Sequence, residues 1–294
     1  LTIELKSLLK STDDFILAAE KKGYNKRILS GKYRIKKGMG NNEIINTLRS
    51  QRLTTTVVFN NQERIEDLAG RIAIQIEADS LELLNAFQDP VFLSENGFKK
   101  VDALTMYLPN SYDIFWDITP QDFRKRMLDY HNLFWNKKRM NKAKDLNLSP
   151  KDVYILASIL QKETIKSKEQ NRIAGVYLNR LKIGMKLQAD PTVIFALKKE
   201  SDDFQRIIKR VLYKDLRTKS PYNTYRHQGL PPGPITMPDL SAIDAVLDYE
   251  KHNYLYFVAS TTNPGYHLFA KNLREHNKNK KVYTRWLRKQ NIYR

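Results

Sequence analysis

The sequence predicts an α+β fold, and three observations carry that prediction. Residues 1–52 show a small β-α-α-β-like pattern. Most of residues 63–183 has apolar residues at helical spacing. Short β-branched and aromatic runs at 53–60, 254–259 and 265–269 indicate strands, and the last two form a hairpin joined through Thr261 to Pro264. We therefore expect small modules followed by a mixed domain of helices and a β-hairpin.

The amino-terminal half divides into short elements. We expect a strand over Leu1 to Leu5, a helix over Thr12 to Lys22, an extended stretch from Gly31, a second helix around residues 42–48 and a helix over Glu63 to Ala78. Residues 80–148 are predicted to be mainly helical, with breaks at 108–113 and 118–120. The basic, polar stretch from Lys137 to Lys144 is typical of a domain boundary.

The pattern changes at residue 149, where helix signals become strong. Ser149 is a good N-cap and Pro150 a good first residue for a helix over 150–165. Ser167 and Gln170 resemble the capping box of a second helix, over 168–183, with Gly184 as its C-cap. Further signals follow along the chain. Asp190, as an N-cap before Pro191, predicts a helix through Lys198, and residues 217–238 predict a long loop with five prolines. We also expect a helix over Leu240 to Leu247 and a basic helix from Asn272.

Glu163 is the strongest candidate for chemistry. The helix before it is apolar around nearly its whole circumference, so it should be buried. Glu163 falls in the last turn, where burial and the helix dipole both disfavour a negative charge. Its pKa should therefore rise and make it a proton donor, although Lys162 and Lys166 oppose this effect, and a structural ion pair explains the same pattern about as well.

Composition narrows the class of protein. The net charge of +19, from 51 Lys and Arg against 32 Asp and Glu, suits an anionic partner or a Lys-rich solvated surface. There is no cysteine, so disulfides and Cys-based metal sites are excluded. No run approaches a membrane span, and no signal peptide is present. Because the sequence opens at Leu1 without a Met, we expect an ectodomain trimmed from its anchor.

Several reaction types lack their motifs. The five histidines have no HExxH spacing, and the GxSxG elbow, the P-loop and the dinucleotide fingerprint are missing. We therefore expect no metal and no cofactor. Carboxylate chemistry with polar and aromatic loops remains, which is typical of enzymes that act on carbohydrates.

Other candidate residues keep two interpretations. Tyr222, Asn223, Thr224 and Tyr225 can line a sugar cleft or form an ordered surface loop, and Gln188 can contact sugar or hydrogen-bond its own loop. Asp190 serves better as an N-cap than as a second acid. His267 and Phe269 share one face of a strand, where a structural role for His267 is somewhat favoured over catalysis. Asn179 ends a helical face with Arg180, which we expect to pair with a carboxylate.

Several short segments of the sequence, taken in chain order, resemble segments of the MltG-type (YceG-like) endolytic lytic transglycosylases. The matching segments begin at Leu156-Ala-Ser-Ile and continue with Lys162-Glu-Thr, Val176-Tyr-Leu-Asn-Arg-Leu, Gly184-Met-Lys-Leu-Gln-Ala-Asp-Pro-Thr-Val-Ile, Ser220-Pro-Tyr-Asn-Thr-Tyr, Gly229-Leu-Pro-Pro-Gly-Pro-Ile, Tyr254-Leu-Tyr-Phe-Val-Ala, His267-Leu-Phe and Glu275-His-Asn. Gly31-Lys-Tyr-Arg-Ile and Leu108-Pro-Asn-Ser-Tyr match more loosely. Family members are expected to read Glu-Lys-Glu-Thr, whereas this chain has Gln161 at the first position.

The resemblance implies a fold, an activity and a location. It implies a LysM-like module at 1–52, an intermediate α+β subdomain at 53–145 and a YceG-like catalytic domain at 146–294. The implied reaction cuts the β-1,4 bond between N-acetylmuramic acid and N-acetylglucosamine in peptidoglycan, with Glu163 as acid and then base and without a cofactor. The sugar would be positioned by residues named above, namely Gln188, Asp190, Tyr222, Asn223, Thr224, Tyr225, His267 and Phe269, with Asn179, Arg180 and Glu275 behind them.

The implied location is the outer side of the bacterial inner membrane, through a single amino-terminal anchor, with glycan strands and cell-wall synthases as partners. Two alternatives stay open. Gln161 leaves room for a non-catalytic, wall-binding or division scaffold of the same fold. The charge alone suggests nucleic-acid binding, but no recognition motif appears, so we expect no such partner.

Overall fold

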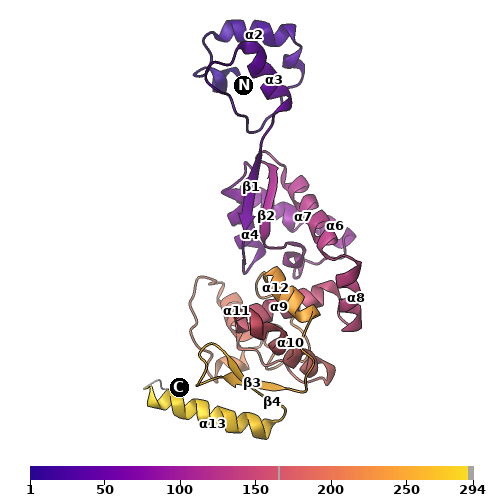
Figure 1. The fold of residues 1–294 in the computed structure, drawn as a ribbon, viewed down its shortest axis with the longest axis vertical. Coiled ribbons are helices and arrows are strands. Elements are labelled where there is room, and N and C mark those ends of the chain that lie inside the picture. The colour runs from indigo at the N-terminus through magenta and orange to yellow at the C-terminus, as the bar shows by residue number, and fades with distance from the viewer. Residues whose placement is uncertain (165, 291–294) are drawn as a thin grey trace.

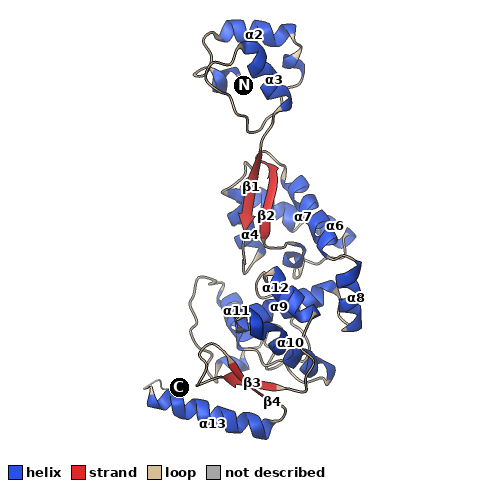
Figure 2. Cartoon of the chain, viewed as in Figure 1, coloured by secondary structure: helices blue, strands red, loops and turns tan. Residues whose placement is uncertain are grey.

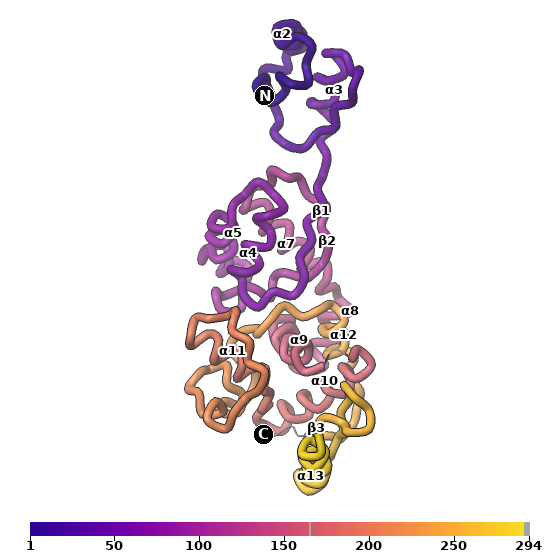
Figure 3. The backbone as a smooth tube through the Cα atoms, turned by 90° about the vertical axis from the view of Figure 1, so that its left-hand side faces the viewer, coloured from indigo at the N-terminus to yellow at the C-terminus, as the bar shows by residue number. Residues whose placement is uncertain are grey.

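A computed structural model describes residues 1–164 and 166–290, which stack into three parts along one axis (Figure 1). The first part lies at one end, a two-stranded sheet with its helices lies in the middle, and the remaining helices and a hairpin lie at the other end. Figure 3, turned by 90°, shows the same order. Figure 2 shows how small the sheets are beside the helices, so the expected α+β class is confirmed.

The first part holds short helices around a small core. They are α1 (Thr2–Leu5), α2 (Thr12–Lys21), the 3₁₀ turn η1 (Tyr24–Lys26) and α3 (Asn41–Ser50). Leu5 packs in that core with Phe15 and Ile45. The strand expected over Leu1 to Leu5 is therefore wrong, because a short apolar run fits a buried helical turn equally well.

A sheet for a LysM-like module is not seen in this part. Among described residues 1–53, strand pairing is limited to one isolated bridge between Lys32 and Leu53. The LysM-like assignment stays a prediction, as do the domain limits after residues 52 and 145. Ile165, the expected last residue of the helix from Pro150, and residues 291–294 of the predicted catalytic domain lie outside the described residues.

The middle part is built on one antiparallel pair of strands. Strand β1 (Thr54–Phe59) pairs with β2 (Asn110–Phe115), with Val57 opposite Tyr112. The helices of this part are α4 (Ile65–Ala73), α5 (Ser80–Phe87), α6 (Pro90–Glu95) and α7 (Pro120–Phe134), with the 3₁₀ turn η2 (Ala103–Met106). The predicted break at 108–113 is largely strand β2. Its buried Tyr112 and Ile114 alternate with exposed residues, which is the period of a strand. The turn-forming residues Pro109, Asn110 and Ser111 made this pattern hard to recognise in the sequence.

The last part surrounds a buried helix. Its elements are α8 (Lys137–Asp145), α9 (Pro150–Glu163), α10 (Ser167–Lys182), α11 (Asp190–Ser201), η3 (Asp215–Arg217), α12 (Leu240–Leu247), β3 (Tyr256–Ala259), β4 (His267–Ala270) and α13 (Leu273–Lys289). Helix α8 is the basic stretch expected to be a boundary, yet its Ala143 packs in the same core as α9. The helices expected at 150–165, 168–183 and 240–247 and the carboxy-terminal hairpin are confirmed.

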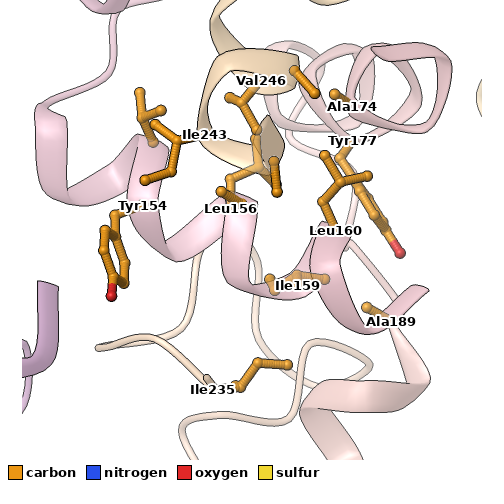
Figure 4. Close-up of a cluster of buried hydrophobic side chains, with 14 of the residues drawn as sticks. Tyr154, Leu156, Ile159, Leu160, Ala174, Tyr177, Ala189, Ile235, Ile243 and Val246 are labelled. Atoms are coloured by element: carbon orange, nitrogen blue, oxygen red, sulfur yellow. The ribbon is translucent and has the colours of Figure 1, made fainter. Parts of the chain in front are cut away.

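Helix α9 runs through the centre of that core, as Figure 4 shows. The side chain of Ser149 accepts from the backbone N–H of Asp152, and Pro150 occupies the first turn, as predicted. All eight residues from Val153 to Leu160 are buried, so the apolar circumference is confirmed. Burial of such a run stabilises this part by roughly 1.5–3 kcal/mol for each large side chain.

Two predicted helix starts are corrected by one residue. Helix α10 has Lys166 as its N-cap, and Ser167 makes no capping bond; Thr164 Oγ1 instead accepts from the backbone N–H of Lys166 at 3.1 Å. Helix α11 has Ala189 as its N-cap, so Asp190 is its first residue. A carboxylate in a first turn still benefits from the helix dipole, and Asp190 thereby keeps its side chain available for another partner.

The middle and last parts contact each other through core packing and a hydrogen bond. Met237, from the long proline-rich loop, is fully buried in the core of the middle part. Tyr154 of α9 donates a 2.9 Å hydrogen bond to the carbonyl oxygen of Tyr107.

Within residues 1–164 and 166–290, no helix combines the length and apolar character needed to cross a bilayer.

Candidate active site

Glu163 is the last residue of α9, at the point where the buried helix reaches the surface. Its side chain is half-buried, so it touches both the core and the solvent. Tyr177 of α10 lies at the edge of the apolar cluster and turns its hydroxyl outward (Figure 4). That hydroxyl donates a 2.6 Å hydrogen bond to Oε1 of Glu163. This bond therefore holds the carboxyl group through one of its two oxygens.

The pKa of Glu163 is raised from 4.5 to about 7. Burial is the largest cause, because it penalises the charged form. The hydrogen bond from Tyr177 acts in the opposite direction, since it stabilises the carboxylate. The negative charge of Asp190 adds to the rise, and the positive charge of Arg180 opposes it. A carboxyl group near pKa 7 can give and take a proton at neutral pH.

Asp190 and Tyr225 form the second half of the site. Tyr225, from the loop over 217–238, donates a 2.6 Å hydrogen bond to Oδ1 of Asp190. The charge of Asp190 raises the pKa of Glu163, and the charge of Glu163 in turn raises the pKa of Tyr225. Burial, followed by the bond to Asp190, raises the pKa of Tyr225, so its hydroxyl stays protonated and donating. The site thus combines one acid of raised pKa with one exposed, hydrogen-bonded carboxylate.

The backbone beside Asp190 is held by the same loop. Gln188 has a left-handed φ of 49°, and its N–H donates to the carbonyl oxygen of Thr224 at 3.2 Å. The N–H of Ala189 donates to Thr224 Oγ1 at 3.0 Å. Gln188 itself is exposed.

Three of the predicted sugar contacts are core residues instead. Tyr222, Asn223 and Thr224 are 3%, 0% and 2% exposed. Tyr222 packs on Phe195, with ring centroids 4.7 Å apart, and the Asn223 amide donates to carbonyl oxygens within its own loop. They shape the loop that presents Tyr225, because buried polar groups must be hydrogen-bonded. Asn223 bonds the backbone of Leu216 and Thr218, and Oγ1 of Thr224 accepts from the N–H of Ala189. Little surface therefore remains on them for contact with a sugar.

His267 and Phe269 share one face of β4, as predicted, while Leu268 between them is exposed. Nδ1 of His267 lies 2.7 Å from Oε2 of Glu169, and its backbone N–H donates to Oε1 of the same residue at 2.8 Å. The His267 ring meets Phe257 edge-on at 5.2 Å. This buried Glu169 joins the hairpin to α10, an anchor that sequence reasoning missed.

The residues expected behind the site occupy supporting positions. Asn179 Nδ2 donates to the carbonyl oxygens of His252 and Tyr254 at 2.8 and 3.0 Å. Arg180 is buried and donates to the carbonyl oxygens of Leu255 and Leu187, both at 2.6 Å. The carboxylate partner expected for Arg180 is thus replaced by backbone. Glu275 closes the first turn of α13, where it accepts from the N–H of Lys271 at 2.9 Å.

Gln161 does not reach the site. Its amide donates to Oδ2 of Asp239 at 3.0 Å and accepts from the N–H of Asp239 at 3.3 Å. Two helical positions separate Gln161 from Glu163, which places the two side chains on different faces. Gln161 therefore bonds Asp239 and makes no hydrogen bond to Glu163.

Two hollows of the surface are lined by residues of both the middle and the last part. One of about 130 Å³ is lined by Lys162 and Pro191, the immediate neighbours of Glu163 and Asp190 in the chain. A larger one, of about 880 Å³, lies elsewhere and is lined by Asn179, Leu230 and Tyr249 among others. In the part of the chain that the structure describes, no cluster of three or more His, Asp or Glu side chains could hold a metal ion.

Comparisons with known proteins agree with the sequence. A model of the YceG-like family matches residues 2–282. An endolytic murein transglycosylase of Bacillus subtilis is 32% identical over 273 residues, which are 86% of this chain and 72% of that protein. One of Streptococcus pneumoniae R6 is 26% identical over 310 aligned positions, which are 95% of this chain; the chain spans about half of that relative, 54% of its length.

A solved structure shares the fold. The 2.6 Å crystal structure of a yceG-like protein from Listeria monocytogenes superposes with a TM-score of 0.63 at 26% identity, over 94% of each chain. The same architecture therefore extends across all three parts described above.

Proposed function

Because the chain belongs to the YceG-like family, we propose that it is an endolytic lytic transglycosylase that cleaves peptidoglycan strands. The names of the curated relatives support the enzyme class and the murein substrate. The bond that we assign is the β-1,4 bond between N-acetylmuramic acid and N-acetylglucosamine. The product ends in 1,6-anhydromuramic acid.

The observation that carries the assignment is a half-buried Glu163 at the end of α9, bonded by Tyr177, where burial raises its pKa to about 7. In the first step, protonated Glu163 gives its proton to the glycosidic oxygen while the bond from C1 to that oxygen breaks. Positive charge then develops on the sugar ring, and the exposed carboxylate of Asp190 is the group that would stabilise it.

In the second step, the Glu163 carboxylate takes the proton of the C6 hydroxyl of the same muramic acid. The C6 oxygen bonds to C1, so no water is consumed. An intramolecular nucleophile gains from proximity, and one carboxyl group then does the acid–base work for which hydrolases of this class use two. Tyr177 orients Glu163 for both transfers through its 2.6 Å hydrogen bond.

The surroundings supply the remaining roles. Tyr225 holds Asp190, and we assign the exposed Gln188 to a sugar hydroxyl. His267, which bonds Glu169, and Phe269, which packs against Phe257, are further residues that we assign to sugar contact. The net charge of +19 suits anionic wall material and lipid headgroups. Action outside the cytoplasm, an amino-terminal membrane anchor and cell-wall synthases as partners belong to the same proposal.

Mass spectrometry of digested glycan strands tests it. Purified protein should release fragments with anhydro ends, which are lighter by one water than fragments with reducing ends. Glu163→Gln should fold normally and release none. Active Glu163→Gln would refute the role of Glu163, and wild-type protein that binds sacculi without shortening any strand would favour the scaffold alternative.

A further inference from the structure

The last turn of α9 is held differently from the rest of the helix. Residues Val153 to Leu160 are fixed by packing, but Gln161, Lys162 and Glu163 are each at least partly exposed. Their positions therefore depend on polar contacts. Each has one, and two of the three lead to the seam between the last and the middle parts of the chain.

The seam is formed by residues 61–63, which connect β1 to α4. Nδ2 of Asn61 donates to the carbonyl oxygen of Met237 at 2.8 Å and to Oδ1 of Asp239 at 3.0 Å. The N–H of Met237 donates to the carbonyl oxygen of Gln62 at 2.8 Å. Asp239 is also the partner of Gln161, so this contact reaches α9.

Glu63 extends the seam to both helices of the site. Its Oε1 accepts from Nζ of Lys162 at 2.8 Å, and its Oε2 accepts from Nζ of Lys198 at 2.9 Å. Lys162 directly precedes Glu163 on α9, and Lys198 lies about two turns after Asp190 on α11. One carboxylate therefore bridges the helix that ends in the acid and the helix that begins with the second carboxylate.

The bridge is partly shielded from water. Side-chain exposure is 25% for Glu63, 39% for Lys162 and 13% for Lys198. Burial alone would raise the pKa of Glu63, but the two ammonium groups outweigh burial and lower it. Glu63 is thus ionised at neutral pH. Two charge-assisted bonds to one carboxylate restrict geometry more than a single exposed ion pair does.

We propose that Glu63 is a positioning residue for catalysis, which sets the separation of Glu163 and Asp190 by joining Lys162 to Lys198. The inference rests on the proposed function for the role of Glu163, and it adds that the middle part completes the active site. Glu63 acts through the two lysines and does not itself contact the glycan.

The test compares two variants, each of which loses an ion pair between α9 and the middle part. Glu63→Gln removes the bridge at the end of α9 that carries Glu163. The control, Lys151→Met, removes a pair with Asp102 (3.0 Å) in the first turn of α9, about 18–20 Å along the helix from Glu163. Steady-state kinetics on purified glycan strands and thermal unfolding are measured for both and for wild type.

We expect Glu63→Gln to lower kcat about tenfold with KM within twofold, because small misplacements of reacting groups are costly. Lys151→Met should keep both constants within twofold. A kcat within twofold of wild type in Glu63→Gln overturns the proposal. So does a rise in KM at unchanged kcat, which would mean direct substrate contact, or a loss of kcat that Lys151→Met shares at equal loss of thermal stability.

A second measurement needs no turnover. The carboxyl ¹³C signal of Glu163, assigned by its loss in Glu163→Gln, is titrated in wild type and in Glu63→Gln. The groups that face Glu163 stay intact in that variant: Tyr177 and Arg180 of α10, Asp190 of α11 and Tyr225 of the loop. The pKa of Glu163 should fall from about 7, because two lysines lose their counter-charge and a loosened turn admits water.

An unchanged titration of Glu163 overturns the proposal even if the wild type cleaves no glycan. Cleavage by wild type with an unaffected Glu63→Gln would leave the proposed function standing and reject only the positioning role. The two failures are therefore distinguishable.

Discussion

The phenol of Tyr177 donates a 2.6 Å hydrogen bond to Oε1 of Glu163, so that a residue of α10 holds the acid at the end of α9. The bond stabilises the carboxylate and partly offsets the effect of burial on its pKa. Tyr177 is itself buried and packs edge-on against Phe257 at 5.9 Å, which fixes the donor. The acidity of Glu163 is thus a balance: burial and Asp190 raise its pKa, while Tyr177 and Arg180 lower it.

Tyr177→Phe should raise the pKa of Glu163 above about 7, because the variant loses the hydrogen bond that stabilises the carboxylate and lowers this pKa. A higher pKa keeps the acid protonated at higher pH, so the alkaline limb of the pH–rate profile should move up by about 0.5–1 unit. Tyr154→Phe is the matched control, since that buried hydroxyl bonds the carbonyl oxygen of Tyr107 and not the site. A limb that moves equally in both variants, or not at all in Tyr177→Phe, contradicts the assignment.

Asp190→Asn should move the same limb in the opposite direction. The negative charge of Asp190 raises the pKa of Glu163, so its removal lowers that pKa and shortens the pH range of the protonated acid. A shift of about 0.5 unit or more to lower pH is expected from the pH–rate profile. Tyr225→Phe keeps the charge on Asp190 and should leave the limb closer to its wild-type position. Equal shifts in the two variants would assign the effect to the hydrogen bond and not to the charge.

Much of this site could be predicted from sequence because its signals are local. Ser149, Pro150 and the apolar run to Leu160 predict a buried helix that ends near Glu163, and the structure has that helix. The direction of the Glu163 pKa shift follows from the same few residues. Local capping and periodicity decide such features, whatever the rest of the chain does.

The remaining features depend on contacts that no local pattern encodes. Tyr222 and Tyr225 are three residues apart in a loop, yet one packs in the core and the other donates to Asp190. Polar loop residues that line a cleft and polar loop residues that hydrogen-bond their own loop have the same composition. Glu63 lies ninety-nine residues before its partner Lys162, so only the fold reveals that contact.

The contribution of Glu163 to the free energy of unfolding should fall as the pH rises from about 4.5 to about 7. Its pKa is 4.5 ordinarily and about 7 in the folded protein, so in this range the unfolded chain releases a proton that the folded one keeps. The contribution is complete below pH 4.5 and is lost as the pH passes 7.

Urea unfolding at pH 5 and pH 8 measures this contribution when wild type is compared with Glu163→Gln. The difference in free energy of unfolding between the two pH values should be larger in wild type by about 2 kcal/mol. Other titrating groups affect both proteins alike and cancel in the comparison. Parallel pH dependences in wild type and variant would mean that Glu163 titrates as an ordinary glutamic acid.

Gly233→Ala should destabilise the joined middle and last parts, because their backbones touch at that residue. A Cβ on Gly233 would lie 2.1 Å from the carbonyl oxygen of Val101, which is backbone and cannot rotate away. We expect a loss of about 3 kcal/mol in the free energy of unfolding, measured in urea. Gly70→Ala is the control: it lies within α4 with open space around its Cβ, so the exchange should stabilise by about 0.5–1 kcal/mol. If Gly233→Ala were as stable as wild type while Gly70→Ala gained stability, the two parts would not be pressed together in solution, and Glu63 could not hold the end of α9.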